Sequence, residues 1–164
     1  NLPLSSILLL YKMFDKPTPL KARGIGMRIR TIGKKHRFTL KRKVLEGHEE
    51  FETDVQELSS AVFNIPEIQE IFDRFSIHGP FFESGKLTTW RTEIPFETGT
   101  LCLDQNSYYG KTDYELEYEL KPDADPEEGL QQFQKILDQI HLPYQRNKRS
   151  KIQRCLEEKR RIEL

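Results

Sequence analysis

The sequence predicts an α+β fold in which helices pack against an antiparallel sheet or barrel. Strand-length segments recur along the chain, and short turns such as Gly33–Lys34–Lys35 and Tyr109–Gly110 join them. Helical stretches separate and follow these segments, in the order strands, helices, strands, helices. With 164 residues and a hydrophobic content of 36%, the chain is too apolar for disorder and long enough for one domain with a real core.

The charged residues balance over the whole chain but are segregated along it. Lysine and arginine number 26, and aspartate and glutamate also number 26. This balance predicts neither a nucleic-acid partner nor a membrane partner. The segment from Lys21 to Lys43 carries ten basic residues and no acid, whereas the segment from Glu46 to Glu57 carries six acids and no lysine or arginine. We therefore expect the fold to bring a basic and an acidic surface together.

Three features bear on cellular location and on the extent of the domain. Cys102 and Cys155 have no metal-binding or redox spacing, which is typical of a reduced, cytoplasmic protein. The apolar run Ile7–Tyr11 is too short to span a membrane, and no signal peptide precedes it. Because the chain starts at Asn1 rather than at methionine, we expect residues 1–164 to form a single domain that lacks its N-terminal strand.

The first half of the chain predicts four strands and then a helical stretch. Residues 1–9 give no clear assignment, and we expect strands at about Leu9–Phe14, Met27–Ile32, Arg37–Val44 and Glu49–Val55. Apolar residues at helical spacing then predict helix over Val55–Phe63 and Pro66–Phe75. Pro66 suits a first helical position.

The second half predicts three strands and two helices. The strands are expected at Lys86–Ile94, Gly99–Asp104 and Thr112–Leu120. An acidic N-cap, a proline and two further acids at Asp125–Glu128 predict a helix that runs to about His141, with an apolar stripe that includes Leu130 and Ile140. A basic helix over roughly Lys148–Arg161 is expected to bury Ile152, Leu156 and Cys155.

The polar face of each of four strands has a single charge sign. Strand alternation groups Arg28 with Arg30, Arg37 with Lys41 and Lys43, Glu50 with Glu52 and Asp54, and Glu115 with Glu117 and Glu119. Carboxylates in a row repel one another, so such a face looks onto water, fixed cations or metal ions. Bases suit phosphate oxygens, and carboxylates suit Mg²⁺ or Mn²⁺. Facing one another inside a barrel, these strands would suit phosphoryl transfer.

No competing catalytic motif is present: the sequence has no P-loop, HExxH, GxSxG or GxGxxG pattern. Instead, six short elements occur in order. They are an aromatic-Phe-Asp strand end at Tyr11–Pro17, an Arg-x-Arg strand at Met27–Arg30, Thr-Leu-Lys at Phe38–Lys41, Leu-Asp at Leu101–Asp104, Glu-x-Glu at Tyr114–Glu117 and Ser-Lys at Arg149–Lys151. In this order and spacing the chain resembles the CYTH superfamily, the triphosphate tunnel metalloenzymes, and is most similar to its small bacterial single-domain members.

The resemblance implies a closed or nearly closed antiparallel barrel of roughly eight strands, a tunnel with helices packed outside it. It also implies a triphosphate-containing small molecule as substrate and Mg²⁺ or Mn²⁺ as cofactor. One departure is clear, because the family's first strand reads Glu-x-Glu-x-Lys and residues 1–14 contain no acid. That strand would supply part of the metal site.

The resemblance further implies roles for individual residues. Phosphate would be bound by Arg28, Arg30, Lys41, Arg91 and Lys151. Metal would be bound by Asp104, Glu115 and Glu117, with Glu50 or Glu52 as the acidic partner on a neighbouring strand. Asp104 and Glu117 would also be catalytic, by positioning the water that attacks the terminal phosphorus. Glu119 would be a rim residue.

Taken alone, the residues leave other interpretations open. Arg28 and Arg30 fit a solvated strand face as well as a phosphate clamp, and Glu115 and Glu117 fit an exposed acidic strand. Lys151 has close alternatives in Lys148, Arg149 and Arg154.

The function that the sequence favours is a metal-dependent triphosphatase. The alternatives are a class IV-type adenylate cyclase on the same fold, a polyphosphate- or nucleotide-binding module without turnover, and nucleic-acid binding through Lys21–Lys43. The adjacent acidic strand argues against the last. A homodimer is one assembly that the sequence allows.

Overall fold

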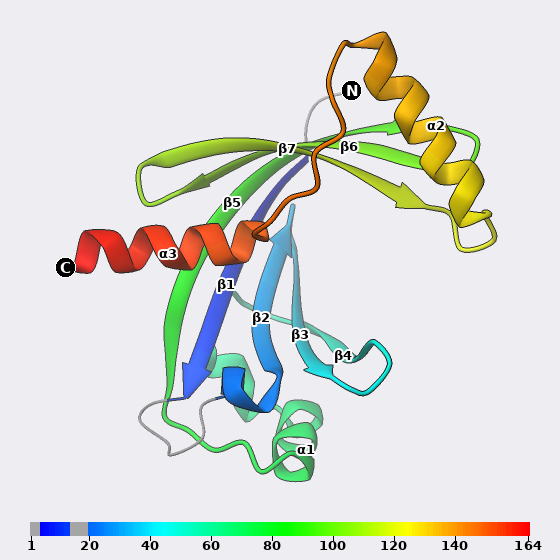
Figure 1. The fold of residues 1–164 in the computed structure, drawn as a ribbon. Helices are drawn as coiled ribbons and strands as arrows, with labels where there is room; N and C mark the ends of the chain where they lie inside the picture. The colour runs from blue at the N-terminus through cyan, green and yellow to red at the C-terminus, as the bar shows by residue number, and fades with distance from the viewer. Residues whose placement is uncertain (1–3, 14–19) are drawn as a thin grey trace.

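Seven strands form a single antiparallel sheet in the computed structural model, which describes residues 4–13 and 20–164 (Figure 1). Their spatial order is β4-β3-β2-β1-β5-β6-β7. The predicted α+β class and antiparallel sheet are confirmed. The strands are β1 (Leu4–Met13), β2 (Ile25–Ile32), β3 (Lys35–Lys43), β4 (His48–Val55), β5 (Phe81–Pro95), β6 (Gly99–Tyr108) and β7 (Lys111–Leu120). The Phe14–Pro17 part of the aromatic-Phe-Asp motif lies outside the described residues.

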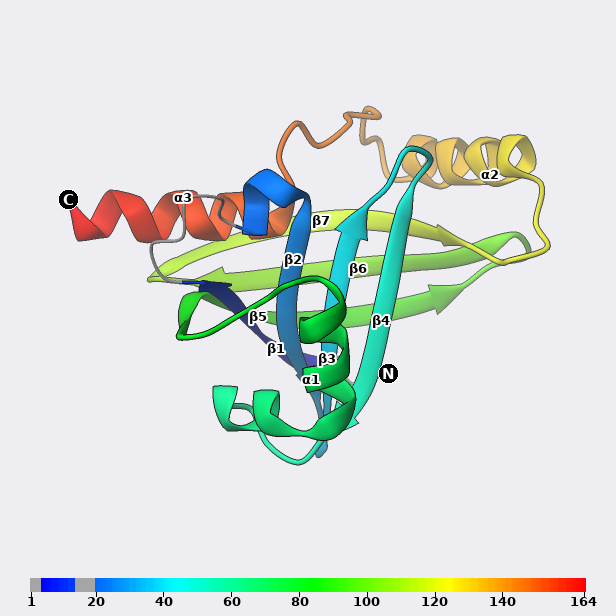
Figure 2. The ribbon, with the colours of Figure 1, turned by 90° about the horizontal axis from the view of Figure 1, so that it is seen from below.

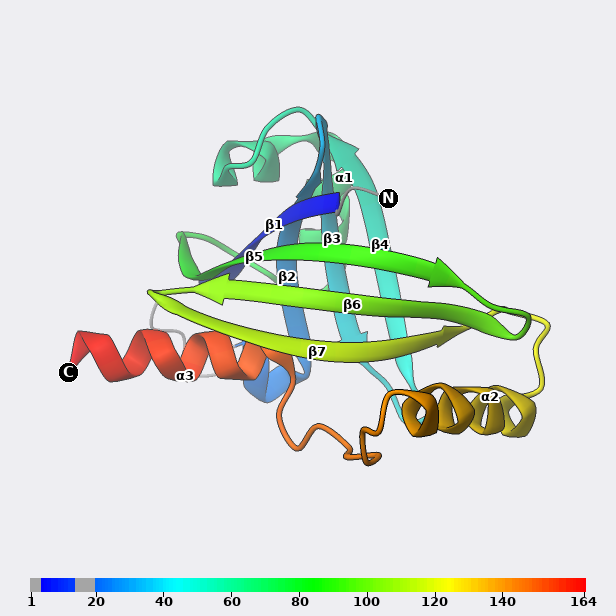
Figure 3. The same cartoon turned by 90° about the horizontal axis from the view of Figure 1, so that it is seen from above.

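The sheet bends sharply between its two halves. β5 has 15 residues and curves along its length, so that β6 and β7 run across the direction of β1–β4 (Figures 1 and 3). β4 and β7 are the two edges, and over the described ranges no backbone pairing joins them. The sheet is therefore curled there but not closed on itself, whereas the resemblance implied a closed or nearly closed barrel.

The helices pack on different parts of this sheet. They are η1 (Leu20–Arg23), η2 (Ser60–Asn64), α1 (Pro66–Arg74), α2 (Pro126–Gln139) and α3 (Lys151–Glu163). α2 contacts β7, and α3 contacts β5 and β6. Seen from below, α1 lies near β3 and β4, far from α2 and α3 (Figure 2). Among residues 4–13 and 20–164, no helix is long and apolar enough to cross a membrane.

The helix predicted over Val55–Phe63 was wrong in its first half. Val55 is still part of β4, and only Ser60–Asn64 form a short 3₁₀ helix. Ile65 is extended, with φ −70° and ψ 145°, because a residue before proline avoids the helical region. The predicted helix at Pro66 is confirmed and starts as a separate element.

The main hydrophobic core lies between β2–β4 and the helices η2 and α1. Ile29 and Phe38 of the sheet are buried against Phe63 and Phe72. The Phe38 ring packs edge-to-face on both of these rings, with centroid distances of 5.6 and 6.0 Å. Because Ile29 points toward the helices, its sequence neighbour Arg28 projects from the opposite face of the sheet.

Helix α3 lies on that opposite face and forms a second, smaller core. Leu10 pairs directly with Arg28 and therefore shares its face. The helix packs closely over Gly85, because a Cβ atom there would lie only 2.8 Å from Leu156 Cδ2 and the end of that side chain would have to shift. The burial predicted for Cys155 is confirmed. The cluster consists of Leu10, Leu87, Tyr108 and Cys155, with Ile152 and Leu156 packed against it.

Helix α2 covers the end of β7 on the other side of the sheet. Asp125 caps the helix as predicted, by accepting hydrogen bonds from the first-turn amides. The Tyr118 and Phe133 rings stack with a centroid distance of 5.5 Å. Of the predicted apolar stripe, Leu130 and Ile140 remain exposed, because α2 packs on the end of β7 and the turn at Thr98 rather than across the sheet.

Candidate active site

The strand register places charged residues from both halves of the sheet on one face. Directly paired residues project from the same side of an antiparallel sheet, as do alternate residues along a strand. The backbone of Arg30 pairs with Leu8 of β1, which pairs with Leu87 of β5. Arg91 follows Leu87 by four residues in β5 and therefore lies on the same face, where it pairs with Asp104 of β6. We call this side the charged face; it carries Arg28, Arg30, Arg91, Asp104, Glu115 and Glu117.

Three carboxylates converge on the charged face. Asp104 of β6 and Glu115 of β7 pair directly, and Glu117 is the next residue on the same side. One carboxylate oxygen from each lies within 4.8 Å of the others. Asp104 is fully buried (0% exposed), and Glu115 is nearly so. Because Mg²⁺ and Mn²⁺ prefer carboxylate oxygens, this carboxylate cluster (Asp104, Glu115 and Glu117) can hold a divalent cation.

Two cations from other elements neutralise part of the cluster. Arg91 of β5 binds Asp104 through two bonds, Nε to Oδ1 at 2.7 Å and Nη2 to Oδ2 at 2.8 Å, and also reaches Glu117 Oε2 at 2.6 Å. Lys151 Nζ, at the start of α3, lies 2.7 Å from Asp104, 3.1 Å from Glu117 and 3.4 Å from Glu115. Both cations thus contact the carboxylates that would hold a metal.

These contacts give the three carboxyl groups different acidities. Burial raises the pKa of Asp104, but hydrogen bonds from Arg91 and Lys151 outweigh burial and hold that pKa below its ordinary value. Burial and the neighbouring Glu117 raise the pKa of Glu115. Glu117 is also affected by burial, yet its contacts with Glu115 and Lys151 lower its pKa. Glu115 therefore retains a proton most readily, and a divalent cation would compete with that proton.

Among the described residues, the two arginines of β2 have no such partners. The Arg28 Nε atom is buried and forms no hydrogen bond. Within the described part of the chain, no carboxylate forms an ion pair with Arg28 or Arg30. Burial and repulsion from Arg28 and Arg91 lower the pKa of Arg30, while Glu52 and Glu117 act in the opposite direction. Half-buried guanidinium groups without an anion are costly, so this pair suits an anionic ligand such as phosphate.

Three of the predicted site residues lie at the β4 edge of the charged face. Lys41 Nζ forms an ion pair of 3.0 Å with Glu50. Glu52 accepts a hydrogen bond of 3.2 Å from Thr39 and lies 3.6 Å from Arg37. Neither Glu50 nor Glu52 is part of the carboxylate cluster. The structure thus brings Arg91, Lys151, Asp104, Glu115 and Glu117 together and keeps Lys41, Glu50 and Glu52 apart from them.

The sequence interpretation missed a polar network beside the carboxylate cluster. Arg154 of α3 binds Asp113 at 2.7 Å and Glu115 at 2.6 Å, and the Tyr108 hydroxyl donates to Asp113. Two signals could have revealed it. Arg154 follows Lys151 by three residues and so lies on the same helix face, and Asp113 shares a strand face with Glu115.

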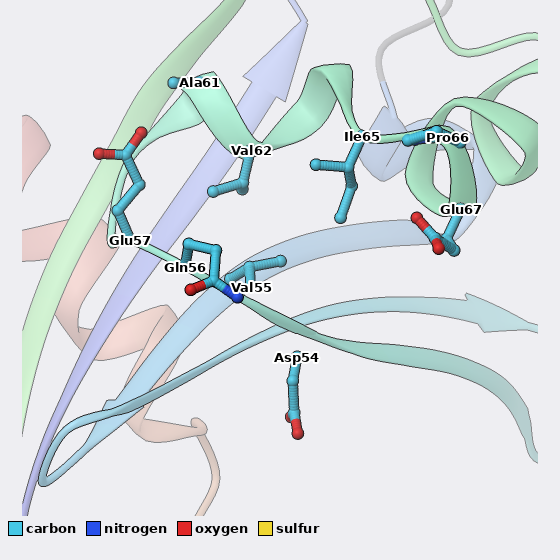
Figure 4. Close-up of a pocket in the computed structure, with 9 residues that line it drawn as sticks. All are labelled: Asp54, Val55, Gln56, Glu57, Ala61, Val62, Ile65, Pro66 and Glu67. Atoms are coloured by element: carbon cyan, nitrogen blue, oxygen red, sulfur yellow. The ribbon is translucent and has the colours of Figure 1, made fainter.

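Two other features complete the surroundings. Glu119, predicted as a rim residue, is exposed and binds Arg91 Nη1 at 2.6 Å. An open pocket of about 450 Å³ lies elsewhere, where β4 meets η2 and α1 (Figure 4). Its charged lining consists of three carboxylates, Asp54, Glu57 and Glu67, with no basic residue. This pocket therefore does not suit a phosphate group.

Comparison with known proteins identifies a family and several relatives. The CYTH domain model matches residues 14–155 of the chain. A protein of Bacillus subtilis (strain 168), named "Putative triphosphatase YjbK", is 36% identical over 146 residues, which make up 87% of this chain and 75% of that protein. The family match thus extends over β2–β7, α1, α2, the first five residues of α3 and the carboxylate cluster.

Solved structures show the same fold. A "putative adenylate cyclase" from Bacillus halodurans has a TM-score of 0.70 and 29% sequence identity, and the match covers 92% of this chain and 82% of that chain. A protein from Hippeastrum, described as a putative adenylyl cyclase with a dominant triphosphatase activity, has a TM-score of 0.71 and 21% identity, with coverage of 92% and 80%. At 21% identity, the second likeness concerns the fold alone.

Proposed function

This chain belongs to the CYTH domain family, and we propose that it is a divalent-metal-dependent triphosphatase that hydrolyses inorganic triphosphate or an organic triphosphate on the charged face. The B. subtilis relative carries the name of a triphosphatase, which supports this choice. We also propose that the curled sheet surrounds the substrate as a tunnel within a single domain.

One observation carries the proposal: two unpaired guanidinium groups share a face with three converging carboxylates. Arg28 and Arg30 have no acidic partner among the described residues, although the charged face is otherwise dense in ion pairs. A triphosphate bound to a divalent cation has the complementary pattern, since its oxygens suit the arginines and its cation suits the carboxylates. A solvated strand face would not bury the Arg28 Nε atom without a partner.

The basic residues would bind phosphate, and the acidic residues would bind the metal ion. Arg28 and Arg30 would bind the phosphate chain, with Arg91 and Lys151 adding positive charge beside it. Asp104, Glu115 and Glu117 would hold Mg²⁺ or Mn²⁺, which when bound supplies charge against the phosphate oxygens and acidifies water. Asp104 is fully buried, whereas the Glu117 side chain is 34% exposed, so Glu117 is the better acceptor for a proton from the attacking water.

Three residues would act at the periphery. Lys41 is held by Glu50 at the β4 edge, and it would reach phosphate only after leaving that ion pair. Glu52 is within electrostatic reach of Arg30. We therefore propose that Glu50 and Glu52 balance the positive charge of the basic residues, and that the metal is bound by the carboxylate cluster alone.

Phosphate release from inorganic triphosphate and from ATP, measured with and without Mg²⁺ or Mn²⁺, tests the proposal. Glu117→Gln and Arg30→Ala should each abolish metal-dependent release while the circular dichroism spectrum is unchanged. Arg42→Ala is the matched control, because Arg42 lies on the opposite face of β3, over the Phe75 ring at 4.7 Å. Full activity in both site variants would refute the charged face as the active site.

Cyclisation of ATP is the second candidate, because the B. halodurans structural relative carries the name of an adenylate cyclase. The same reactions, analysed for cyclic AMP and pyrophosphate, distinguish the two activities. If cyclic AMP is the main product, the activity of these residues is cyclisation of ATP rather than hydrolysis. Tight triphosphate binding without either product would instead indicate a binding module.

A further inference from the structure

We propose that Arg154 is a positioning residue that leaves Glu115 only one oxygen for a metal ion and thereby favours Mg²⁺ and Mn²⁺ over Ca²⁺. This inference rests on the proposed function, because it assumes that the carboxylate cluster holds the metal. Arg154 itself lies outside the cluster and would touch neither metal nor phosphate.

The two oxygens of Glu115 have different surroundings. Oε2 accepts a bond of 2.6 Å from Arg154 Nη2 and one of 3.3 Å from the Asn147 side-chain amide. Oε1 lies 3.4 Å from Lys151 Nζ, the same atom that contacts Asp104. Oε1 therefore faces the carboxylate cluster, while Oε2 is occupied by two donors from the C-terminal segment.

Arg154 is held so that it cannot easily leave Oε2. Its Nε and Nη2 atoms both bind Asp113, at 2.7 and 3.2 Å, and its Nη1 atom donates to the backbone oxygen of Arg149 at 2.9 Å. All three nitrogens of the guanidinium group thus have acceptors, and the Arg154 side chain is only 20% exposed. A planar group fixed at three corners has little freedom to rotate.

Asp113 is fixed in turn by a buried hydrogen-bond chain. The Tyr108 hydroxyl donates to one of its oxygens, and the Asn106 amide donates to the other at 3.1 Å. Thr89 then donates to the Asn106 carbonyl oxygen at 2.7 Å. Thr89, Asn106 and Tyr108 are all buried. The chain therefore runs from the interior of β5 and β6 through Asp113 to Arg154, and it pre-organises the Glu115 carboxylate.

This arrangement discriminates between cations by the number of oxygens that they require. Ca²⁺ takes six to eight oxygen ligands and commonly binds a carboxylate through both oxygens, whereas Mg²⁺ needs an octahedron of about six and is satisfied by one oxygen from each carboxylate. With Oε2 bound to Arg154, Glu115 can supply one oxygen only. Without Arg154, Glu115 could rotate and bind Ca²⁺ through both.

Displacement of Mn²⁺ tests this inference on the full chain without substrate. Mn²⁺ binding is followed by electron paramagnetic resonance, and Ca²⁺ or Mg²⁺ is added as competitor. For Arg154→Gln we expect the affinity for Ca²⁺ relative to Mg²⁺ to rise about tenfold, the range typical of residues that orient metal ligands. Arg161→Gln on the same helix is the control, because Arg161 pairs only with Glu158 in the described structure. It should leave the ratio unchanged.

The possible outcomes separate the role of Arg154 from the proposed function. Equal weakening of Ca²⁺ and Mg²⁺, or an unchanged ratio, would show that Arg154 merely anchors α3 and would overturn the inference. A wild-type chain that binds neither cation, even when triphosphate is added, would refute the metal site itself and with it the triphosphatase. If Arg154→Gln does not fold, Arg154→Lys provides the decision, because lysine keeps the positive charge but cannot bind Asp113 and Oε2 with the planar three-nitrogen group of arginine. It should shift the ratio in the same direction by a smaller factor, and an unchanged ratio would overturn the inference.

Discussion

The charged face has two regions that differ in how their charges are balanced. In the region formed by β5–β7 and α3, nearly every charge has a partner: Arg91, Lys151 and Arg154 bind Asp104, Asp113, Glu115, Glu117 and Glu119. In the region formed by β2, Arg28 and Arg30 have no acidic partner among the described residues. The first region keeps an excess of acid, with five carboxylates against three cations, and the second keeps an excess of base.

This difference indicates that a ligand with charges of both signs would bind more tightly than a metal ion or a phosphate group alone. A free metal ion would compete with Arg91 and Lys151 for the carboxylates. A free phosphate would bind the arginines but would be repelled by the neighbouring acidic region. A metal–triphosphate complex satisfies both regions at once, because Arg91 and Lys151 can exchange carboxylate oxygens for phosphate oxygens. The following predictions test whether the two regions are as distinct as their ion pairs indicate.

Loss of the β2 arginines should have the largest effect. For the double variant Arg28→Gln, Arg30→Gln we expect hydrolysis of inorganic triphosphate to fall by about 100-fold or more, since each charged hydrogen bond contributes roughly 1.5–3 kcal/mol. Mn²⁺ binding in the absence of substrate should be nearly unchanged. Steady-state phosphate release and Mn²⁺ titration measure the two quantities. A parallel loss of metal binding would show that the two regions form one site that cannot be divided.

Breaking the buried ion pairs of the other region should reduce stability in addition to metal binding. Asp104→Asn leaves Arg91 and Lys151 without their shared, fully buried partner, so we expect the free energy of unfolding to fall by about 3 kcal/mol. Urea unfolding followed by fluorescence measures this change. Asp54→Asn is the matched control, because the Arg37–Asp54 ion pair is exposed and its loss should leave the unfolding midpoint unchanged.

A smaller effect should appear in the pH dependence of stability. Burial raises the pKa of Asp113, but hydrogen bonds from Arg154, Tyr108 and Asn106 lower it below the ordinary value. A carboxyl group with a lowered pKa in the folded state stabilises the fold above its unfolded pKa of about 4, and this contribution is lost as the pH falls below that value. Asp113→Asn should therefore flatten the decline in stability below pH ~4. Identical slopes for variant and wild type in urea unfolding between pH ~3 and ~6 would contradict the assignment.

The smallest expected effect concerns the attachment of α3. Burial raises the pKa of Cys102 and of Cys155 to about 11, so both thiols should react slowly with iodoacetamide at pH ~8. Lys151→Met removes an ion-pair anchor of α3 and should speed labelling of Cys155 several-fold while Cys102 on β6 stays protected. Peptide mass spectrometry measures both rates. Equal acceleration of the two thiols would indicate global unfolding rather than release of the helix.

Local patterns in the sequence were sufficient to predict which residues share a strand face. Alternation has a period of two residues, so Arg28 with Arg30, and Glu115 with Glu117, follow from position in the strand alone. The start of α2 at Pro126 follows equally from its acidic cap. These predictions succeeded because the physics that decides them acts over a few residues.

Contacts between distant elements could not be predicted in the same way. The sheet order places β1 between β2 and β5, and this order and its register bring Arg91 and Arg30 to one face. Charge sign alone could not show that Glu50 pairs with Lys41 instead of joining the carboxylate cluster. Arg154 was named only as an alternative to Lys151, because helix spacing does not reveal which strand residue a side chain meets.

The close approach of α3 to Gly85 couples the apolar packing of the helix to the position of its Lys151 side chain. Leu156 rests on Gly85 at one point, and Lys151 reaches the Asp104 carboxylate about five residues away along the same helix, or roughly 7.5 Å at 1.5 Å per residue. A methyl group at position 85 would displace only the end of the Leu156 side chain, whereas a bulky side chain there would push α3 outward and draw the Lys151 ammonium group from its carboxylates. A bulky substitution at this apolar contact would therefore reduce activity in the same way as loss of the Lys151 charge, although it changes no charged residue.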